Sequence, residues 1–125
     1  MKANTPRSKK AKGNRAEMKV AELYRRYKLF PKAQRMPMSG AMAFHKSDIF
    51  KGEADDWSDE VKCQETVKLW AWWKQASEQS GLYQKPILHI TGNHRPILSV
   101  MKIEDYMDLR AEIKELRDEL QRLRK

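Results

Sequence analysis

The stretch from Trp57 to Gln64 alternates between two sets of positions, and this alternation constrains the fold more than any other feature of the sequence. In an extended chain, its odd-numbered residues share one face and its even-numbered residues share the other. The next stretch, Thr66 to Ser80, spaces its large side chains at helical intervals and stops before Gly81, a residue type that commonly ends helices. A strand followed directly by a helix predicts a domain of the mixed α/β class.

The rest of the sequence predicts further strands and helices around this pair. Asn14 and Glu17 form a capping-box pattern at the start of a helix that Pro31 ends. Residues 92–95 have turn chemistry and separate two β-branched runs, which predicts a hairpin. The predicted strands cover 33–36, 47–50, 57–64, 86–91 and 96–101, and the final helix covers 104–125. The predicted order is α-β-β-β-α-β-β-α, with a central sheet.

These elements divide the chain into three predicted parts. Residues 1–12 are basic, include Pro6 and offer little to bury, so we expect a disordered basic arm. Residues 13–103 hold all the strands and the first two helices and form the predicted globular domain. Residues 104–125 form the final helix.

The final helix repeats its apolar side chains at spacings of three and four residues, which is the heptad pattern of a coiled coil. The same stripe would also serve a helix that packs on its own domain. A helix over 104–125 is about 30 Å long, more than so small a core readily covers. We therefore expect it to protrude and to pair with a second subunit, giving a homodimer. The stripe consists of Tyr106, Leu109, Ile113, Leu116, Leu120 and Leu123.

Positive charge is concentrated in the first third of the chain. Residues 1–46 hold thirteen Lys and Arg against two acids, a net charge of +11, and residues 47–125 hold thirteen against fifteen, a net charge of −2. Such a basic region attracts polyanions, since each phosphate that Lys or Arg neutralises releases counterions. Nucleic acid is favoured over an anionic membrane, because no strongly amphipathic helix rich in Lys and Trp adjoins the basic run.

Several classes of protein are excluded by features that the sequence lacks. No apolar run approaches the ~20 residues of a membrane span, and none follows the basic N-terminus as in a secretory signal. Cys63 is the only cysteine, which excludes an internal disulfide and a CxxC zinc site, and no nucleotide-binding fingerprint predicts a small-molecule cofactor. We interpret His45, His89 and His94 as surface residues. We expect a cytoplasmic protein, in the host cytoplasm if a phage encodes it, with no membrane partner.

Two carboxylates and a lysine are the strongest candidates for a reactive site. Asp48 lies in a short predicted strand, and Glu60 and Lys62 share one face of the alternating strand. If the two strands pair, the carboxylates converge and offer hard oxygen ligands to Mg²⁺ or Mn²⁺. Such a cation lowers the pKa of a bound water, and a lysine can orient that water or stabilise a phosphate charge. The alternative is a solvated strand face on which Glu60 and Lys62 form an ordinary salt bridge.

Two other features that precede the alternating strand in the sequence could belong to the reactive site, and each also has an ordinary structural explanation. Glu17 is a third carboxylate that could reach the cluster, although by itself it fits a helix cap. Arg35, Ser39 and Gly40 form a basic, hydroxylic and flexible stretch of the residue types that contact phosphates. An ordinary surface loop is the alternative for this stretch.

Taken in order, these residues resemble the PD-(D/E)xK nuclease superfamily, and most closely its archaeal-type Holliday junction resolvases. A bare Asp…Glu-x-Lys pattern often arises by chance, but an Arg-x-Pro-x-Ser-Gly stretch between a helical Glu and that pattern is much more specific. The resemblance spans roughly residues 12–101. It implies a restriction-endonuclease-like fold, with a central mixed β-sheet flanked by helices and followed here by the long heptad-patterned helix. The matching residues are Lys12-Gly13, Glu17, Arg35 to Gly40, Asp48-Ile49, Glu60 to Cys63, and Gln75.

The resemblance implies a role for each matching residue. Asp48 and Glu60, with the carbonyl of Val61, are implied to hold Mg²⁺, for which Mn²⁺ would substitute. Lys62 corresponds to the catalytic lysine, and Glu17 to an additional acid that serves the metal and the reaction. The implied DNA contacts, with Ser39 also catalytic at the scissile phosphate, are Arg35, Ser39, Gly40, Lys12, Arg15, Lys46, Gln64 and Gln75.

The sequence departs from the family pattern in two places. Ser47 stands where the motif has Pro, and the acidic stretch 53–56 lies beside the expected site. Asp59 is also acidic, but it belongs to the opposite face of the strand from Glu60, so Glu60 is the preferred ligand.

The resulting hypothesis is a Holliday junction resolvase, a metal-dependent and structure-selective endonuclease that nicks symmetry-related strands of a four-way DNA junction. A two-fold symmetric dimer would place two active sites on two strands, and basic residues of the arm and first helix would hold the DNA by phosphate contacts. Two alternatives stay open. The protein could be another nuclease of the superfamily that acts on flaps, nicks or in a restriction-like role, or a non-catalytic basic DNA-binding protein.

Overall fold

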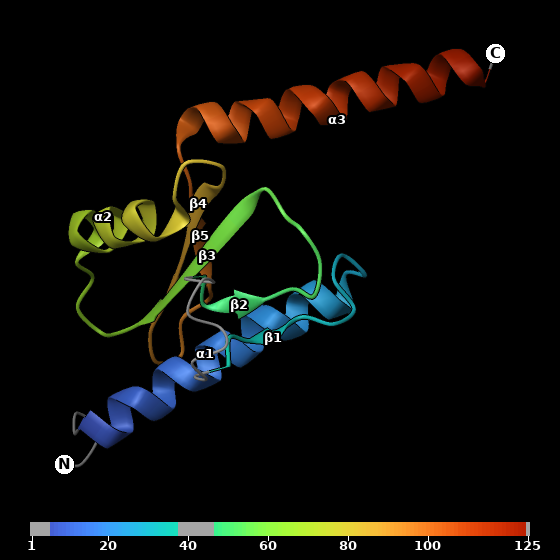
Figure 1. The fold of residues 1–125 in the computed structure, drawn as a ribbon. Helices are drawn as coiled ribbons and strands as arrows, with labels where there is room; N and C mark the ends of the chain where they lie inside the picture. The colour runs from blue at the N-terminus through green and yellow to red at the C-terminus, as the bar shows by residue number, and fades with distance from the viewer. Residues whose placement is uncertain (1–5, 38–46, 125) are drawn as a thin grey trace.

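The computed structural model describes residues 6–37 and 47–124. Within these residues the elements follow the predicted order of helices and strands (Figure 1). The strands predicted at 33–36, 47–50 and 96–101 are shorter than expected. The elements are α1 (Pro6–Arg26), β1 (Gln34–Arg35), β2 (Ile49–Phe50), β3 (Trp57–Cys63), α2 (Leu69–Ser80), β4 (Lys85–Thr91), β5 (Leu98–Val100) and α3 (Ile103–Leu123).

The strands form two sheets, of three and of two strands, where a single central sheet was predicted. β3 and β4 run parallel with α2 as the connection between them, and β5 returns antiparallel to β4 as the predicted hairpin. The register pairs Glu60 with Leu88 and Val61 with His89. β3 is an edge strand of this group, and β1 and β2 form a separate antiparallel pair. The α/β class with a mixed sheet is therefore confirmed.

α1 and α2 cover opposite faces of the β3–β4 pair. Val61 packs into the core under α1, whereas Leu88 packs into the core under α2. Because Leu88 is the register partner of Glu60, Glu60 lies on the α2 face of the sheet and Asp59 lies on the α1 face. The predicted alternation along β3 is thereby confirmed. The buried core is formed by Ala16, Val20, Ala21, Ala33, Ile49 and Val61 on one face and by Trp72, Ala76 and Leu88 on the other.

The first helix begins earlier than predicted. α1 starts at Pro6, so residues 6–12 of the expected disordered arm are helical and that part of the prediction is wrong. Pro is favoured at a first helical position, and the Ala, Lys and Arg residues that follow are good helix formers. Asn14 therefore lies inside the helix, and its side chain accepts a hydrogen bond from Arg35 instead of capping a helix end. The capping-box prediction is wrong for the same reason.

α3 extends away from the rest of the molecule (Figure 1). It begins after only two residues that follow β5, and none of its residues is buried. Its hydrophobic side chains face solvent, with Leu116 58% and Leu123 74% exposed. The predicted protrusion is confirmed, because the stripe does not pack on the described part of its own domain. Among residues 6–37 and 47–124, no helix is both long and apolar enough to cross a membrane.

Candidate active site

Residues 47 and 48 are tied to the free edge of β3 by hydrogen bonds to Asp59 and Val61. The Asp48 amide donates to the Asp59 carbonyl at 2.7 Å, and the Ser47 hydroxyl accepts from the Asp59 amide at 2.9 Å. The Asp48 carboxylate itself accepts a hydrogen bond from the Val61 amide at 2.7 Å. These bonds involve Asp59 and Val61, the two neighbours of Glu60 in the strand, and so they hold Asp48 beside Glu60. Ser47, noted only as a departure from the family motif, is thus one of the residues that place Asp48.

Asp48, Glu60 and Lys62 lie in one charged cluster. The Lys62 ammonium is 3.5 Å from a carboxylate oxygen of Glu60, whose residue is only 4% exposed. Burial and, after it, the negative charge of Asp48 raise the pKa of Glu60 to about 7, and Lys62 opposes the shift. Burial also raises the pKa of Asp48 to about 6, with the Val61 hydrogen bond opposing and the charge of Glu17 adding to it. The positive charge of Lys62 therefore does not offset the effect of burial on the pKa values of the two carboxylates.

The backbone of Val61 is directed to the same place. In an extended strand, the amide and the carbonyl of one residue leave the chain on the same side, alternating from residue to residue. The Val61 amide bonds the Asp48 carboxylate, and the Asp59 carbonyl, two residues earlier, bonds the Asp48 amide. The Val61 carbonyl therefore points from the free edge of β3 toward the Asp48 segment.

Glu17 reaches this region from α1, but it has a partner of its own. Its carboxylate accepts a hydrogen bond from Arg35 at 2.9 Å, and Arg35 also donates to the Asn14 side chain at 2.7 Å. The charge of Glu17 contributes to the raised pKa values of Asp48 and Glu60. Arg35 is about one-third exposed in this bridge, so it fixes Glu17 beside the cluster and still offers part of its guanidinium to solvent.

The cluster has the chemistry of a divalent-cation site. Carboxylate and carbonyl oxygens are hard ligands, and Mg²⁺ typically takes one or two carboxylates and completes its shell with water and phosphate oxygens. The uncompensated negative charge of Asp48 and Glu60 is what such a cation would neutralise. Within the part of the chain that the structure describes, no group of three or more His, Cys, Asp and Glu is arranged to hold a metal ion. The residues present thus fit a two-carboxylate site and not a closed protein cage.

The opposite face of β3 carries a buried polar network that the sequence analysis missed. Asp59 is 1% exposed, and its carboxylate accepts hydrogen bonds from Tyr24 at 2.6 Å and His89 at 2.7 Å and pairs with Lys51 at 2.5 Å. Burial alone would raise the pKa of Asp59, but the bond from His89 and the charge of Lys51 hold it below its usual value. The interpretation of His89 as a surface residue is wrong, because the β3–β4 register pairs it with Val61, on the same face as Asp59, where it is buried.

Two predicted DNA contacts line a groove between α1 and the turn that joins β4 to β5. This hollow, of about 510 Å³, includes Lys12 and Arg15, as well as Lys19 and Arg95, which were not predicted. No Asp or Glu is among the described residues that line it, so we call it the basic groove. Lys19 lies one helical turn after Arg15, and that spacing was the available signal for it.

The other predicted contacts are less closely grouped. Gln64 is exposed directly after β3, and Gln75 is half-buried on α2. Ser39, Gly40 and Lys46, as well as His45, lie outside the described residues.

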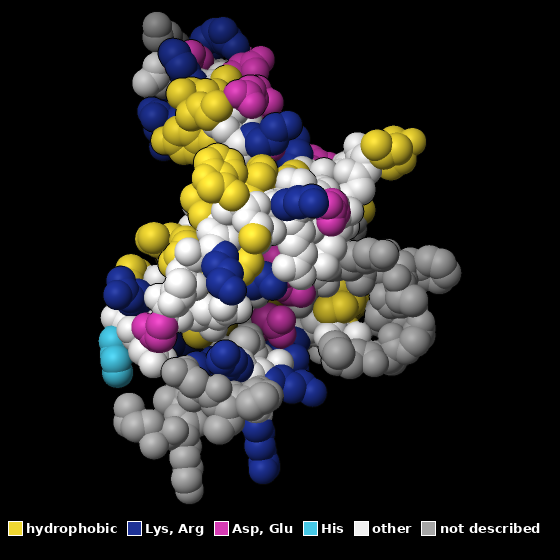
Figure 2. All heavy atoms as spheres, turned by 90° about the vertical axis from the view of Figure 1, so that its left-hand side faces the viewer, with side chains coloured by type: hydrophobic (Ala, Val, Ile, Leu, Met, Phe, Trp, Pro, Cys, Tyr) yellow, Lys and Arg dark blue, Asp and Glu magenta, His cyan; other side chains and the backbone are white. Residues whose placement is uncertain are grey.

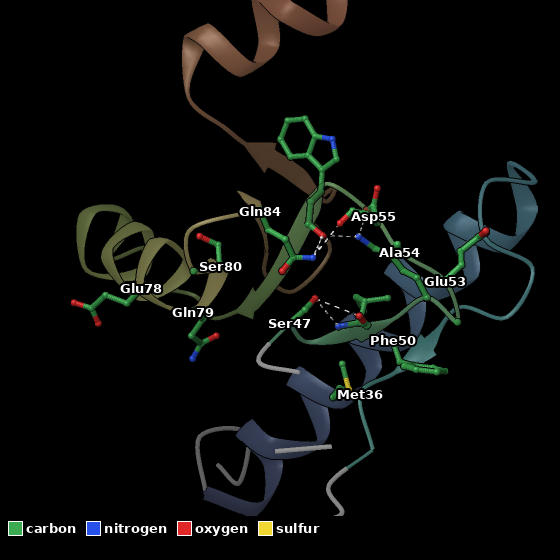
Figure 3. Close-up of a pocket in the computed structure, with 15 residues that line it drawn as sticks. Met36, Ser47, Phe50, Glu53, Ala54, Asp55, Glu78, Gln79, Ser80 and Gln84 are labelled. Atoms are coloured by element: carbon green, nitrogen blue, oxygen red, sulfur yellow. Dashed lines mark hydrogen bonds and ion pairs between the residues drawn. The ribbon is translucent and has the colours of Figure 1, made fainter. Parts of the chain in front are cut away.

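A larger hollow of about 720 Å³ lies between the β2–β3 connection and the end of α2 (Figure 3). It contains none of Asp48, Glu60 and Lys62, and its charged lining includes Glu53, Asp55 and Glu78. Figure 3 shows the Ser47 hydroxyl at its rim, bonded to the backbone of Ile49. Glu53 and Asp55 therefore line a hollow separate from the cluster of Asp48, Glu60 and Lys62, and Asp55 pairs there with Lys51.

An Asp directly before one strand and a Glu-x-Lys pair on the next, beside a mixed sheet with helices on both faces, is the arrangement that defines the PD-(D/E)xK class of nucleases. Comparison with protein families supports this class directly. The family described as "Phage putative PDDEXK endonuclease" matches residues 8–122, nearly the whole chain. The chain therefore belongs to this endonuclease family. No curated protein and no solved structure gave a significant match.

Proposed function

We propose that the protein is a Mg²⁺-dependent DNA endonuclease that nicks four-way junctions, with Asp48, Glu60 and Lys62 as its catalytic centre. The observation that carries the proposal is the cluster itself. At the free edge of β3, the Asp48 carboxylate, from the segment before β2, accepts a hydrogen bond from the Val61 amide between Glu60 and Lys62, and the Lys62 ammonium pairs with Glu60. Family membership supports an endonuclease, and the choice of metal and of junction substrate is our inference.

Each residue of the cluster has a distinct task in this proposal. Asp48, Glu60 and the Val61 carbonyl would hold the cation. When bound, a divalent cation supplies a water of lowered pKa and stabilises negative charge on the phosphate. The Lys62 ammonium, 3.5 Å from Glu60, is held where it can orient the attacking water or stabilise the leaving oxygen as a point charge. Glu17, held by Arg35, adds negative charge beside the site.

The basic groove is the proposed path of the DNA backbone. Lys12, Arg15 and Lys19 project from α1, and Arg95 comes from the β4–β5 turn, so the groove combines positive charge from two elements. Phosphate contacts of this kind position a duplex without reading its sequence, which suits an enzyme that selects DNA by shape.

Selection of a four-way junction is supported by symmetry. A junction offers two equivalent strands related by a two-fold axis, and a homodimer offers two equivalent sites in the same relation. The exposed apolar stripe of α3 provides a surface through which two copies can associate.

The direct test compares cleavage of four synthetic substrates by the full chain: a four-way junction, a flap, a nicked duplex and a linear duplex. We expect paired nicks in the junction with Mg²⁺ and none with EDTA. Asp48→Asn and Lys62→Ala should abolish cleavage while junction binding largely survives, and Asp56→Asn, which changes an exposed acid outside the cluster, should cleave normally. Equal cleavage of all four substrates would refute junction selectivity, and retained cleavage in either cluster variant would refute the site.

A further inference from the structure

The polar residues beside the apolar stripe of α3 follow a strict charge pattern. In heptad lettering, Tyr106, Ile113 and Leu120 occupy position a, and a leucine occupies every position d. The g positions then hold only acids and the e positions, from the second turn onward, hold only arginines. The acids are Asp105, Glu112 and Glu119, and the arginines are Arg110, Arg117 and Arg124.

Each acid precedes an arginine by five residues, a spacing that has no use within a single helix. Side chains three or four residues apart face each other on a helix, and those five apart do not. In the structure, Glu119 pairs with Arg122, and Arg110 lies over the ring of Tyr106 at 5.7 Å. In a parallel two-stranded coiled coil, by contrast, a g side chain meets the e side chain five residues further along the partner.

We infer that α3 pairs with α3 of a second copy of the chain in a parallel, in-register coiled coil. All three acid–arginine pairs are then attractive and are formed twice by symmetry. In an antiparallel pair, g faces g and e faces e, so acid would face acid and arginine would face arginine. Leucine at every d position together with Ile113 at an a position favours two strands. The surface is free for this pairing, since no residue of α3 is buried and its hydrophobic side chains gather on the exposed side seen in Figure 2.

Parallel pairing fixes how the two catalytic domains are arranged. Each α3 follows β5 after only Met101 and Lys102, so both domains are attached at the same end of the coiled coil. The two-fold axis then runs along the paired helices and relates the two clusters of Asp48 and Glu60. Where the proposed nuclease function holds, one dimer can present two active sites to one DNA molecule.

Two charge-reversed variants of the full chain test the pairing. Glu112→Lys/Glu119→Lys reverses two g positions, and Arg117→Glu/Arg124→Glu reverses the e positions that they face. Glu115→Lys/Asp118→Lys is the matched control for the first variant, because it makes the same change of charge at positions that point away from the partner. All these residues are exposed, so the catalytic domain should fold normally in each variant. Sedimentation equilibrium gives the dimer Kd without DNA, so the outcome does not depend on nuclease activity.

We expect a wild-type dimer, a dimer Kd at least tenfold weaker for either reversed variant alone, and recovery of dimer in their equimolar mixture. The control variant should dimerise like the wild type. In an antiparallel pair, g faces g and e faces e, so neither reversal would remove an attractive contact and neither single variant would dimerise more weakly than the wild type. That result, or a wild-type protein that stays monomeric at 100 µM, would overturn the inference.

A cross-link reads the orientation directly. Leu123→Cys in a Cys63→Ser background places one thiol at the last d position, where two parallel helices bring the thiols together. Mild oxidation should give a disulfide-linked dimer in high yield. A wild-type-like dimer that does not cross-link would contradict the parallel arrangement.

Discussion

Asp48→Asn should abolish cleavage and yet make the metal-free protein more stable. Asn is nearly the same size and its side-chain oxygen can still accept the hydrogen bond from the Val61 amide. What the variant loses is a negative charge in a place where burial raises the pKa of Asp48 from 3.8 to about 6. The charge of Asp48 also contributes to the raised pKa of Glu60, which moves from 4.5 to about 7.

The magnitude follows from linkage between pKa and stability. One pKa unit corresponds to 1.36 kcal/mol, so the shift of Asp48 costs the folded state about 3 kcal/mol when the carboxyl is fully ionised. Between pH 4 and pH 7 the folded state binds more protons than the unfolded state, so these two groups make the free energy of unfolding fall as pH rises. Allowing for the cost of burying the amide, we expect Asp48→Asn to gain roughly 1–3 kcal/mol at pH 8 and almost nothing at pH 4.

Thermal and urea unfolding in EDTA at low salt, at pH 4 and pH 8, measure this difference. For a chain of this length, a gain of 1–3 kcal/mol raises Tm by roughly 4–12 °C. Asp56→Asn, in an exposed position, should leave Tm unchanged. Added Mg²⁺ should stabilise the wild type and not Asp48→Asn. If Asp48→Asn is no more stable than the wild type at pH 8, the negative charge of Asp48 does not destabilise the metal-free fold, which contradicts its raised pKa.

Three further predictions concern the groups around the cluster. Ser47→Ala removes the acceptor for the Asp59 amide, so it should cost about 1–3 kcal/mol in urea unfolding and reduce kcat; unchanged kcat would exclude a positioning role for Ser47. Lys12→Ala/Arg15→Ala should lower the slope of log Kd against log salt for DNA binding by about 2, whereas Lys74→Ala on α2 should not; equal slopes would place the DNA elsewhere. Protons compete with the metal ion for the Asp48 and Glu60 carboxyls, whose pKa values are about 6 and 7. Calorimetry should therefore show the affinity for Mn²⁺ falling at least tenfold from pH 8 to pH 5.5, and a pH-independent affinity would exclude these two ligands.

The sequence predicted the elements whose signal is local. The alternation of 57–64 predicted β3 and its two faces, and Gly81 marked the end of α2, where the structure has it at a positive φ of 70°. The start of α1 was predicted too late, because Asn14 and Glu17 have the residue types of a cap but a helix of good formers continues through them. A capping pattern shows where a helix is able to start, but the helix begins earlier when good helix formers precede the pattern.

The polar contacts of the site depend on register, which no local pattern gives. His89 is buried because the register of β4 on β3 pairs it with Val61, from where its ring reaches Asp59, thirty residues earlier in the chain. The Ser47 hydroxyl likewise finds the Asp59 amide only once the 47–48 segment lies along the edge of β3. The two-residue repeat predicted that Glu60 and Lys62 share a face, and the family resemblance added Asp48. The place of Asp48 beside them depends on its hydrogen bonds to β3, which no local pattern gives.

The most direct test of a shared metal site is the anomalous signal of crystals of the wild-type protein grown with Mn²⁺. We expect an anomalous peak within coordination distance of carboxylate oxygens from both residue 48 and residue 60, and we expect it to disappear in Asp48→Asn crystals grown in the same way. A peak only at other acids, such as those of residues 53–56, or a peak that persists in Asp48→Asn, would contradict it.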